Sequence, residues 1–280
     1  MFKDILVHIP TERPLQPVID ASVSLAAAFG AHLDAVATSY IRTSAANVIT
    51  GGAALTAAAV FEMEQERAAE RGAAALAIFE TEARHAGITY KSRSIEDLPA
   101  EAAVMIGAAA RLYDLTVVLQ PDAERQTFDN SIPTEILFQA GGPVLFIPHT
   151  FRGTFRAKRV GVCWDGSRVA ARSLRDSRPF LSQADALTAI SINEAQVAPA
   201  AASVQELVRH MARAGLPIDL IELTGGHAEI GPLILSMVAD ERIDMLVMGA
   251  YGHSRLRERI LGGVTRAMLQ TMTVPTLMSH

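Results

Sequence analysis

The sequence predicts an α/β protein made of two tandem doubly wound domains, each with a five-stranded parallel sheet. Two observations support this fold class: the chain repeats its own pattern, and within each repeat short apolar runs alternate with longer helical segments. Since apolar residues fill these runs continuously, the strands should be buried on both faces. Alternation of strand and helix gives parallel strands that are joined by right-handed crossovers.

The repeat begins again near residue 157, where RVGVCWDGSR resembles the opening DILVHIPTER. Later segments follow in the same order, with YDLTVVL opposite IDMLVMG and IPTEILFQAGGPVLFIP opposite VTRAMLQTMTVPTLMSH. We therefore expect two domains, the first half at residues 1–152 and the second half at residues 157–280. Both have a normal domain size.

The apolar runs give the expected strands. In the first half they are ILVHI, HLDAVATSY, ITYKSRSI, LTVVL and PVLFI, and in the second RVGVCW, ALTAISI, PIDLIEL, MLVMGA and PTLMS. A helical segment rich in Ala and Glu ends at Gly87, a residue type typical of helix ends. The segment at residues 43–59 has no counterpart in the second half, and we expect a loop there.

Composition excludes several classes of protein. Of the 280 residues, 50% are hydrophobic and 20% charged, which favours a packed core over disorder. The net charge of −5 disfavours non-specific binding to nucleic acid. The single cysteine, Cys163, excludes a disulfide framework and a cysteine zinc site. With no signal peptide and no apolar run of ~18–20 residues, we expect a cytoplasmic protein that does not enter a membrane.

The stretch GAYGHSRLRERILGGVTR, residues 249–266, carries four glycines after an apolar run. We expect Gly252 to let the backbone turn sharply, and Gly262 and Gly263 to begin a helix with Thr265 in its first turn. Free N–H groups and the positive dipole end at a helix start bind anions, and bare glycines let a phosphate approach. The alternative is that the glycines only make two tight turns.

Asp165 directly follows the first strand of the second half. In a doubly wound sheet, ligands bind outside the carboxyl ends of the strands, so this carboxylate could accept hydrogen bonds from ribose hydroxyls. The alternative is a turn or a helix N-cap, which the sequence Asp-Gly-Ser favours by itself.

The pattern G-x-x-G, nine residues, then G-[small]-V-[ST] after the fourth strand resembles the universal stress protein family, as do CWDGSRVAARSL and VPTLMSH. The two halves resemble its tandem members. The resemblance implies an adenine nucleotide alpha hydrolase-like fold whose two final strands pair edge to edge in an intrachain pseudo-dimer, which could pair again into a homodimer. It implies ATP, ADP or AMP as ligand, with or without Mg²⁺. The residues implied at this site are Asp165, Ile192, Met248, Gly249, Gly252, His253, Gly262, Gly263, Val264 and Thr265.

One departure from the family pattern concerns the site itself. Gly263 stands where the pattern has Ser or Thr, so one hydroxyl donor worth about 0.5–1.5 kcal/mol is lost, and we expect weaker nucleotide affinity and not abolished binding. The first half lacks the glycines, with Leu119 opposite Gly249 and Asp122 opposite Gly252, and Pro10 opposite Asp165. We therefore expect a degenerate first-half site that is kept for structure or partners; a different ligand is the alternative. The stretch ERQTFDNS is expected to be a plain loop.

We expect a stress-response regulator or sensor. No positioned catalytic base is evident and no histidines have metal-ligand spacing, so no catalytic or metal residue is assigned. The alternatives are a nucleotide-free interaction scaffold, a slow ATP hydrolase, and a true hydrolase or transferase. His253 could flank phosphate or be solvated, His227 lies near the rim of the site, and Cys163 is a core thiol.

Overall fold

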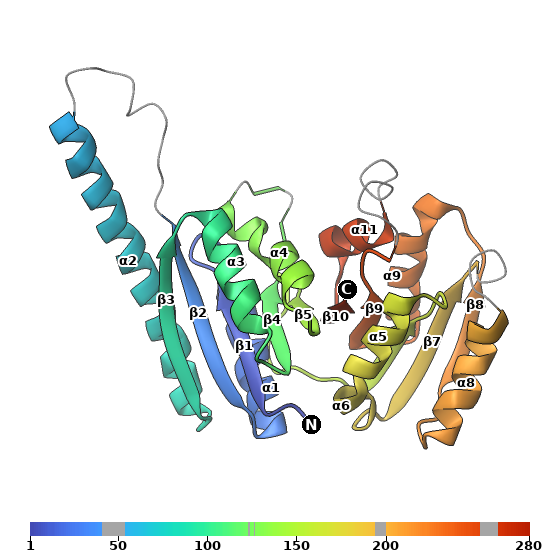
Figure 1. The fold of residues 1–280 in the computed structure, drawn as a ribbon. Coiled ribbons are helices and arrows are strands. Elements are labelled where there is room, and N and C mark those ends of the chain that lie inside the picture. Colours follow the sequence, from blue (N-terminus) through green and yellow to red (C-terminus); the bar gives the residue numbers. More distant parts are fainter. Residues whose placement is uncertain (41–53, 123, 126, 194–199, 253–262) are drawn as a thin grey trace.

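A computed structural model gives the protein one ten-stranded sheet in the order β3-β2-β1-β4-β5-β10-β9-β6-β7-β8 (Figure 1). The structure describes residues 1–40, 54–122, 124–125, 127–193, 200–252 and 263–280, and leaves the side chains of residues 54–61 and 227 undescribed. The predicted fold class is confirmed, because each half supplies five consecutive strands of this sheet.

The strands coincide with the apolar runs of the sequence. In the first half they are β1 (Asp4–Ile9), β2 (His32–Tyr40), β3 (Tyr90–Asp97), β4 (Leu115–Leu119) and β5 (Val144–Ile147). In the second half they are β6 (Arg159–Cys163), β7 (Ala186–Ile192), β8 (Asp219–Leu223), β9 (Met245–Gly249) and β10 (Thr276–Ser279). Strands β4, β5 and β10 are buried at every residue, as expected for strands covered on both faces. The outer strands β3 and β8 are partly exposed.

Helices cover both faces of the sheet, and two apolar clusters mark these faces. One cluster holds core residues of α1 (Gln16–Phe29), α2 (Ala54–His85), α5 (Arg168–Asp176), α6 (Arg178–Leu181) and α8 (Val204–Arg213). The other holds residues of α3 (Pro99–Ala110), α4 (Ile132–Gln139), α9 (Ile230–Asp240) and α11 (Val264–Thr271). Short 3₁₀ turns lie at η2 (Phe128–Asn130), η3 (Ala200–Ala202) and η4 (His227–Glu229).

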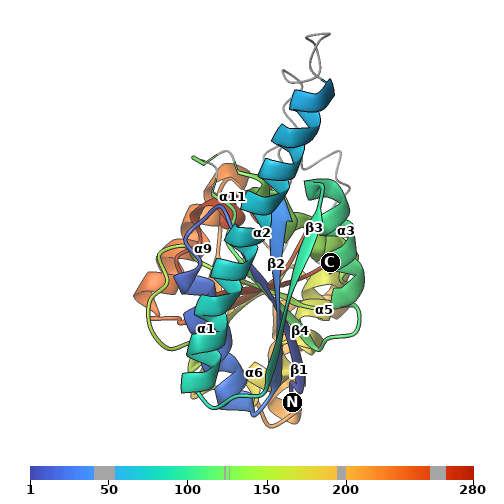
Figure 2. The same cartoon turned by 90° about the vertical axis from the view of Figure 1, so that its left-hand side faces the viewer.

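Helix α2 begins earlier than the sequence predicted. It starts at Ala54, so the loop expected at residues 43–59 was wrong for its last six residues, while residues 41–53 lie outside the described ones. The alanine-rich start, ALTAAA, has high helix propensity and extends the helix. Figure 2 shows that the amino-terminal turns of α2 project beyond the sheet. None of the described helices is both long enough and apolar enough to cross a membrane.

The two halves join through β5 and β10, which pair antiparallel with Leu277 opposite Leu145. All other strand pairs are parallel among the described residues. The predicted edge-to-edge pairing of the two final strands is thus confirmed. It protects two sheet edges that would otherwise be open to pairing with other chains.

Side chains reinforce this junction. Phe2 and Phe29 of the first half pack against Phe180 of the second. Their ring centroids lie 5.0 Å and 5.4 Å, respectively, from that of Phe180. The Gln120 side chain at the end of β4 donates to the Leu269 carbonyl of α11 at 3.0 Å. The contacts between the halves therefore include both apolar packing and directed hydrogen bonds.

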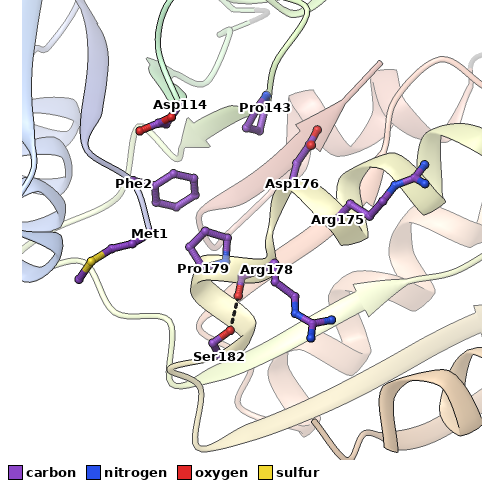
Figure 3. A pocket seen from close by; sticks show the side chains of 9 residues that line it. All are labelled: Met1, Phe2, Asp114, Pro143, Arg175, Asp176, Arg178, Pro179 and Ser182. Atoms are coloured by element: carbon purple, nitrogen blue, oxygen red, sulfur yellow. Dashed lines mark hydrogen bonds between the residues drawn. The ribbon is translucent and has the colours of Figure 1, made fainter. Parts of the chain in front are cut away.

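A pocket of about 400 Å³ also lies between the halves (Figure 3). It is lined by Met1, Phe2, Asp114, Pro143, Arg175, Asp176, Arg178, Pro179 and Ser182. These residues precede β1, β4 and β5, or lie at the end of α5 and in the segment that leads to β7. The pocket is therefore at the amino-terminal edge of the strands, opposite the edge where doubly wound sheets bind ligands.

Candidate functional site

The predicted site residues follow three neighbouring strands of the second half. Strand β6 pairs with β7 on one side and with β9 on the other, so their carboxyl ends lie together. The chain passes from β6 to β7 and returns on the opposite side to β9, which makes the gap between β6 and β9 the switch point. Asp165 follows β6, Ile192 ends β7 half-buried, and Gly249 ends β9.

Asp165 lies in the turn between β6 and α5. Its Oδ1 accepts a hydrogen bond from the Ser167 N–H at 2.9 Å, and Gly166 has a φ of 72°. Ser167 is the N-cap of α5, and its hydroxyl oxygen accepts from the Ala170 N–H. The turn interpretation of Asp165 is therefore correct, while the N-cap is Ser167. The carboxylate is exposed, and its Oδ2 has no donor among the described residues, so it can still meet a ligand.

Gly249 is a glycine because helix α5 lies against it. A Cβ at this position would be 2.6 Å from the Ala170 nitrogen and 2.7 Å from the Val169 carbonyl carbon, both backbone atoms. A Cβ on Gly252 would meet only the tip of the Val169 side chain, at 2.9 Å. The first glycine is thus required by packing of α5 onto β9, and the second leaves the exposed surface beside Ser167 bare.

The turn after β9 is made by Tyr251. This residue has a φ of 54°, whereas Gly252 does not have a positive φ, so the left-handed conformation in this segment is adopted by Tyr251. The Tyr251 N–H donates to the hydroxyl oxygen of Thr265 at 3.2 Å. Thr265 is buried and ties the turn to α11, a role the sequence did not indicate. Its own hydroxyl proton can still be donated.

The prediction that a helix starts after the paired glycines is confirmed for the described residues. Gly263 is the N-cap of α11, with φ −55° and ψ 154°, and Val264 is the first helical residue. The first intrahelical bond runs from the Ala267 N–H to the Gly263 carbonyl. The preceding N–H groups of the first turn have no intrahelical partner, as at every helix start. Gly262 and His253 lie outside the described residues.

Two further positions belong to the apolar packing, Met248 buried and Cys163 half-buried. Met248 is buried in the apolar cluster beneath α9 and α11. Cys163 lies in β6, and burial, together with the nearby Asp165 carboxylate, raises the pKa of its thiol to about 12. Such a thiol stays protonated and unreactive at neutral pH, in agreement with the expected core role. Among the residues that the structure describes, no three His, Cys, Asp or Glu side chains are grouped to hold a metal ion.

Taken together, the second half presents an exposed carboxylate, a bare glycine surface and two helix starts, of α5 and α11, at one switch point. Residues 157–280 match the sequence model of the universal stress protein family. The second half is a universal stress protein domain.

Several known proteins are similar to this chain. A universal stress protein of Synechocystis sp. is 29% identical over 141 residues, a match that covers 48% of this chain and 46% of that protein. The match therefore spans about half the length of that relative. A universal stress protein of Archaeoglobus fulgidus superimposes with a TM-score of 0.73 at 15% identity, covering 98% of this chain and 97% of that one. A functionally unknown protein of Pseudomonas aeruginosa superimposes with a TM-score of 0.59 at 16% identity, covering 99% of this chain and 92% of that one. These two structures extend the fold likeness to both halves.

The first half has the same fold as the universal stress protein domain but fills the corresponding edge with side chains. The His8 Nε2 lies 3.1 Å from the Thr38 hydroxyl, which donates to the Tyr40 oxygen at 2.6 Å. The Tyr40 hydroxyl then donates to Asp129 at 2.8 Å. Because the Thr38 proton points to Tyr40, Thr38 can only accept from His8, so His8 carries its proton on Nε2.

Burial shifts the pKa values in this chain of hydrogen bonds. It lowers the pKa of His8 to about 3, helped by the positive charge of Arg13. It raises the pKa of the Asp129 carboxyl to about 6, although hydrogen bonds from the Glu12 N–H and Tyr40 oppose this shift. Burial and the Asp129 charge also raise the pKa of Tyr40. The network therefore holds a neutral histidine and a carboxyl group that titrates near pH 6.

Sequence reasoning missed this network. ERQTFDNS was expected to be a plain loop, but Asp129 within it is buried, and its Oδ2 accepts from the Glu12 N–H at 2.7 Å. Arg13 is also buried and donates to the Gln120 carbonyl at 2.6 Å. A signal was available, because His8 interrupts an otherwise apolar strand and a buried histidine needs a polar partner.

Proposed function

We propose that the second half binds an adenine nucleotide, ATP, ADP or AMP, with or without Mg²⁺. The observation that carries this proposal is the convergence of Asp165, the Gly249–Gly252 turn and the Gly263-capped start of α11 at the β6–β9 switch point. In this arrangement the free Asp165 oxygen accepts from ribose hydroxyls. The N–H groups at the start of α11 and the Thr265 hydroxyl donate to phosphate oxygens. Ile192 edges the adenine, and Met248 supports the floor of the pocket.

The protein then acts as a cytoplasmic stress-response regulator or sensor. Residues 1–152 and 157–280 form its two domains, paired as an intrachain pseudo-dimer that can associate into a homodimer. Regulation is favoured over catalysis because the sequence indicates no positioned general base and no acidic pair around the glycine loop for Mg²⁺-assisted hydrolysis. A slow ATPase is the catalytic alternative, tested by following phosphate release with Mg²⁺ over hours.

One experiment tests nucleotide binding directly. Purified protein is denatured, the supernatant is analysed for AMP, ADP and ATP, and nucleotide-free protein is titrated with ATP in a calorimeter. We expect co-purified nucleotide or measurable heat. Gly252→Val covers the bare surface beside Ser167 and should abolish that heat, whereas Asp122→Ala, at the matching first-half position, should not. No nucleotide and no heat at millimolar ATP would refute the proposal.

A nucleotide-free interaction scaffold is the second candidate, and one surface favours it. The outer face of α3 exposes Val104 and Met105, which are 52% and 50% exposed. They line a depression of about 420 Å³ together with Asp97, Ala100 and Glu101. Neighbouring exposed apolar side chains on one helix are typical of protein contact surfaces. A folded protein that fails the ATP titration would favour this candidate.

A further inference from the structure

Three aromatic side chains meet beside the candidate nucleotide site, and one of them belongs to the first half. The rings of Phe138 on α4 and Tyr251 after β9 lie 4.7 Å apart. His280, at the end of the chain, packs edge-on against Phe138 at 4.9 Å. The His280 Nδ1 also lies 3.1 Å from the carbonyl oxygen of Ala250 and donates to it. The turn at residues 250–252 is therefore held partly by side chains outside its own loop.

Tyr251 needs such support. Its φ of 54° lies in the left-handed region, where a residue other than glycine pays roughly 1–3 kcal/mol. Compensating contacts within the described part of the chain include the packing of the Tyr251 ring on Phe138 and the hydrogen bond from its N–H to the Thr265 hydroxyl oxygen. Without the ring contact, Tyr251 would gain by relaxing to a negative φ, and that change would redirect Gly252 and release Thr265.

We propose that Phe138 of the first half is a positioning residue for the phosphate-binding turn of the second half. The inference rests on the proposed function, because it assigns a role at that same site. Phe138 does not touch the nucleotide. It acts by holding Tyr251 in the left-handed conformation that places Gly252 beside Ser167 and the Tyr251 N–H against the hydroxyl oxygen of Thr265 in the first turn of α11.

The reverse contact cannot form, which ties this device to the half that carries the glycines. In the alignment of the two halves, Tyr251 corresponds to Pro121 and Phe138 to Gln270. Proline and glutamine form no aromatic pair. The first half thus supports the second half's site, and the second half gives no equivalent support in return.

The test measures ATP affinity by calorimetry in the full chain. Phe138→Ala should weaken ATP binding by between about twofold and about tenfold, the range expected for loss of one aromatic pair. Phe138→Tyr should restore most of the affinity, because it keeps the ring. Phe128→Ala removes a partly exposed aromatic ring of the same half and should leave ATP affinity unchanged. Equal weakening by Phe128→Ala and Phe138→Ala would overturn the proposal, because it would indicate general destabilisation.

A double-mutant cycle tests whether Phe138 acts through Tyr251. Glycine adopts a positive φ without cost, so Tyr251→Gly removes the need for Phe138. In the Tyr251→Gly background, Phe138→Ala should cause no further loss of ATP affinity. Additive losses would overturn the proposal, because they would mean that Phe138 acts independently of Tyr251.

Hydrogen exchange without nucleotide separates this inference from the proposed function. Phe138→Ala should speed amide exchange of a peptide spanning residues 249–252, since the Tyr251 N–H loses its partner when the turn relaxes. Phe128→Ala should not change this exchange. If the natural protein binds no ATP, the proposed function fails, and the exchange result alone decides whether Phe138 positions the turn. Unchanged amide exchange in Phe138→Ala would overturn the proposal that Phe138 positions this turn.

Discussion

At the carboxyl edges of the two halves, equivalent strands end at equivalent positions, but the residues that follow them differ in chemistry. In the second half, this edge carries the exposed Gly252 beside Ser167, the buried Gly263 at a helix start, and the exposed Asp165, whose Oδ2 has no donor among the described residues. In the first half, Tyr40 and Asp129 fill it, hydrogen-bonded to each other and buried. The comparison teaches that the fold tolerates either solution. Glycines at the end of β9 and at the start of α11 are therefore a property of particular residues and not of the fold.

Matching positions show how single residues decide the outcome. In the first half, the fully buried Leu119 ends β4. At the matching position of the second half, Gly249 ends β9 and lies against the backbone of α5. Ser131 and Gly263 are both helix N-caps, of α4 and α11, which supports the alignment of the two halves. Although Ser131 occupies the N-cap position, its hydroxyl donates to the Phe128 carbonyl and accepts no hydrogen bond from the first turn of α4. The first half thus keeps the helix start while its side chains serve the local structure.

The largest effect should come from filling the glycine at the end of β9. Gly249→Val would force side-chain atoms into the backbone of α5, and we expect a loss of at least about 3 kcal/mol in the free energy of unfolding, with loss of ATP binding. The matched first-half change, Leu119→Val, should cost only about 1 kcal/mol and leave binding intact. Urea denaturation and calorimetry measure both. Equal costs in the two halves would contradict the steric explanation of Gly249.

The pH dependence of stability should expose the first-half network. His8, with a pKa lowered to about 3, stabilises the fold while neutral, so its contribution is lost as pH falls below about 6.5. Asp129, with a pKa raised to about 6, has the opposite sign: stability falls as pH rises from about 4 to about 6. Each contributes about 1.4 kcal/mol per pH unit, so between pH 4 and 6 the two nearly cancel.

Two variants separate these contributions. His8→Asn removes the histidine contribution and keeps that of Asp129. As pH falls from 6 to 4, only the natural protein loses stability through His8, so the unfolding free energy of the variant should rise relative to it by about 2–3 kcal/mol. Asp129→Asn should show the opposite trend over the same range. Urea denaturation at several pH values measures all three proteins, in which the remaining carboxylates titrate alike. Parallel profiles would show that the buried network does not control the pH response.

The smallest effect should come from restoring a hydroxyl at the start of α11. The backbone of Gly263 has a negative φ, so Gly263→Ser introduces no backbone strain. Serine is a better N-cap than glycine by a few tenths of a kcal/mol, and its hydroxyl could add one phosphate hydrogen bond of about 0.5–1.5 kcal/mol. We expect slightly higher stability and about twofold to tenfold tighter ATP binding. Gly263→Ala, without the hydroxyl, is the control. Tighter binding in both variants would assign the gain to backbone rigidity.

Much of the architecture could be predicted because it depends on local patterns. Apolar runs such as LTVVL and MLVMG became β4 and β9, and the family resemblance correctly implied that β5 and β10 would pair. The site was predicted less completely. The glycines were recognised by spacing, but the steric reason for Gly249 lies in α5, a helix distant in sequence. The start of α2 was misplaced because an alanine-rich loop and an alanine-rich helix look alike in composition.

By itself, the sequence determined which segments form strands, how the halves repeat and where the glycines fall, because hydrophobic period and turn chemistry act over a few residues. Only the tertiary structure decided that Tyr251 makes the turn, that Phe138 of the other half packs on it, and that Asp129 closes the first-half edge. Each of these features depends on contacts between residues far apart in the chain. Such contacts follow from the way the sheet brings strand ends together, and no local pattern encodes them.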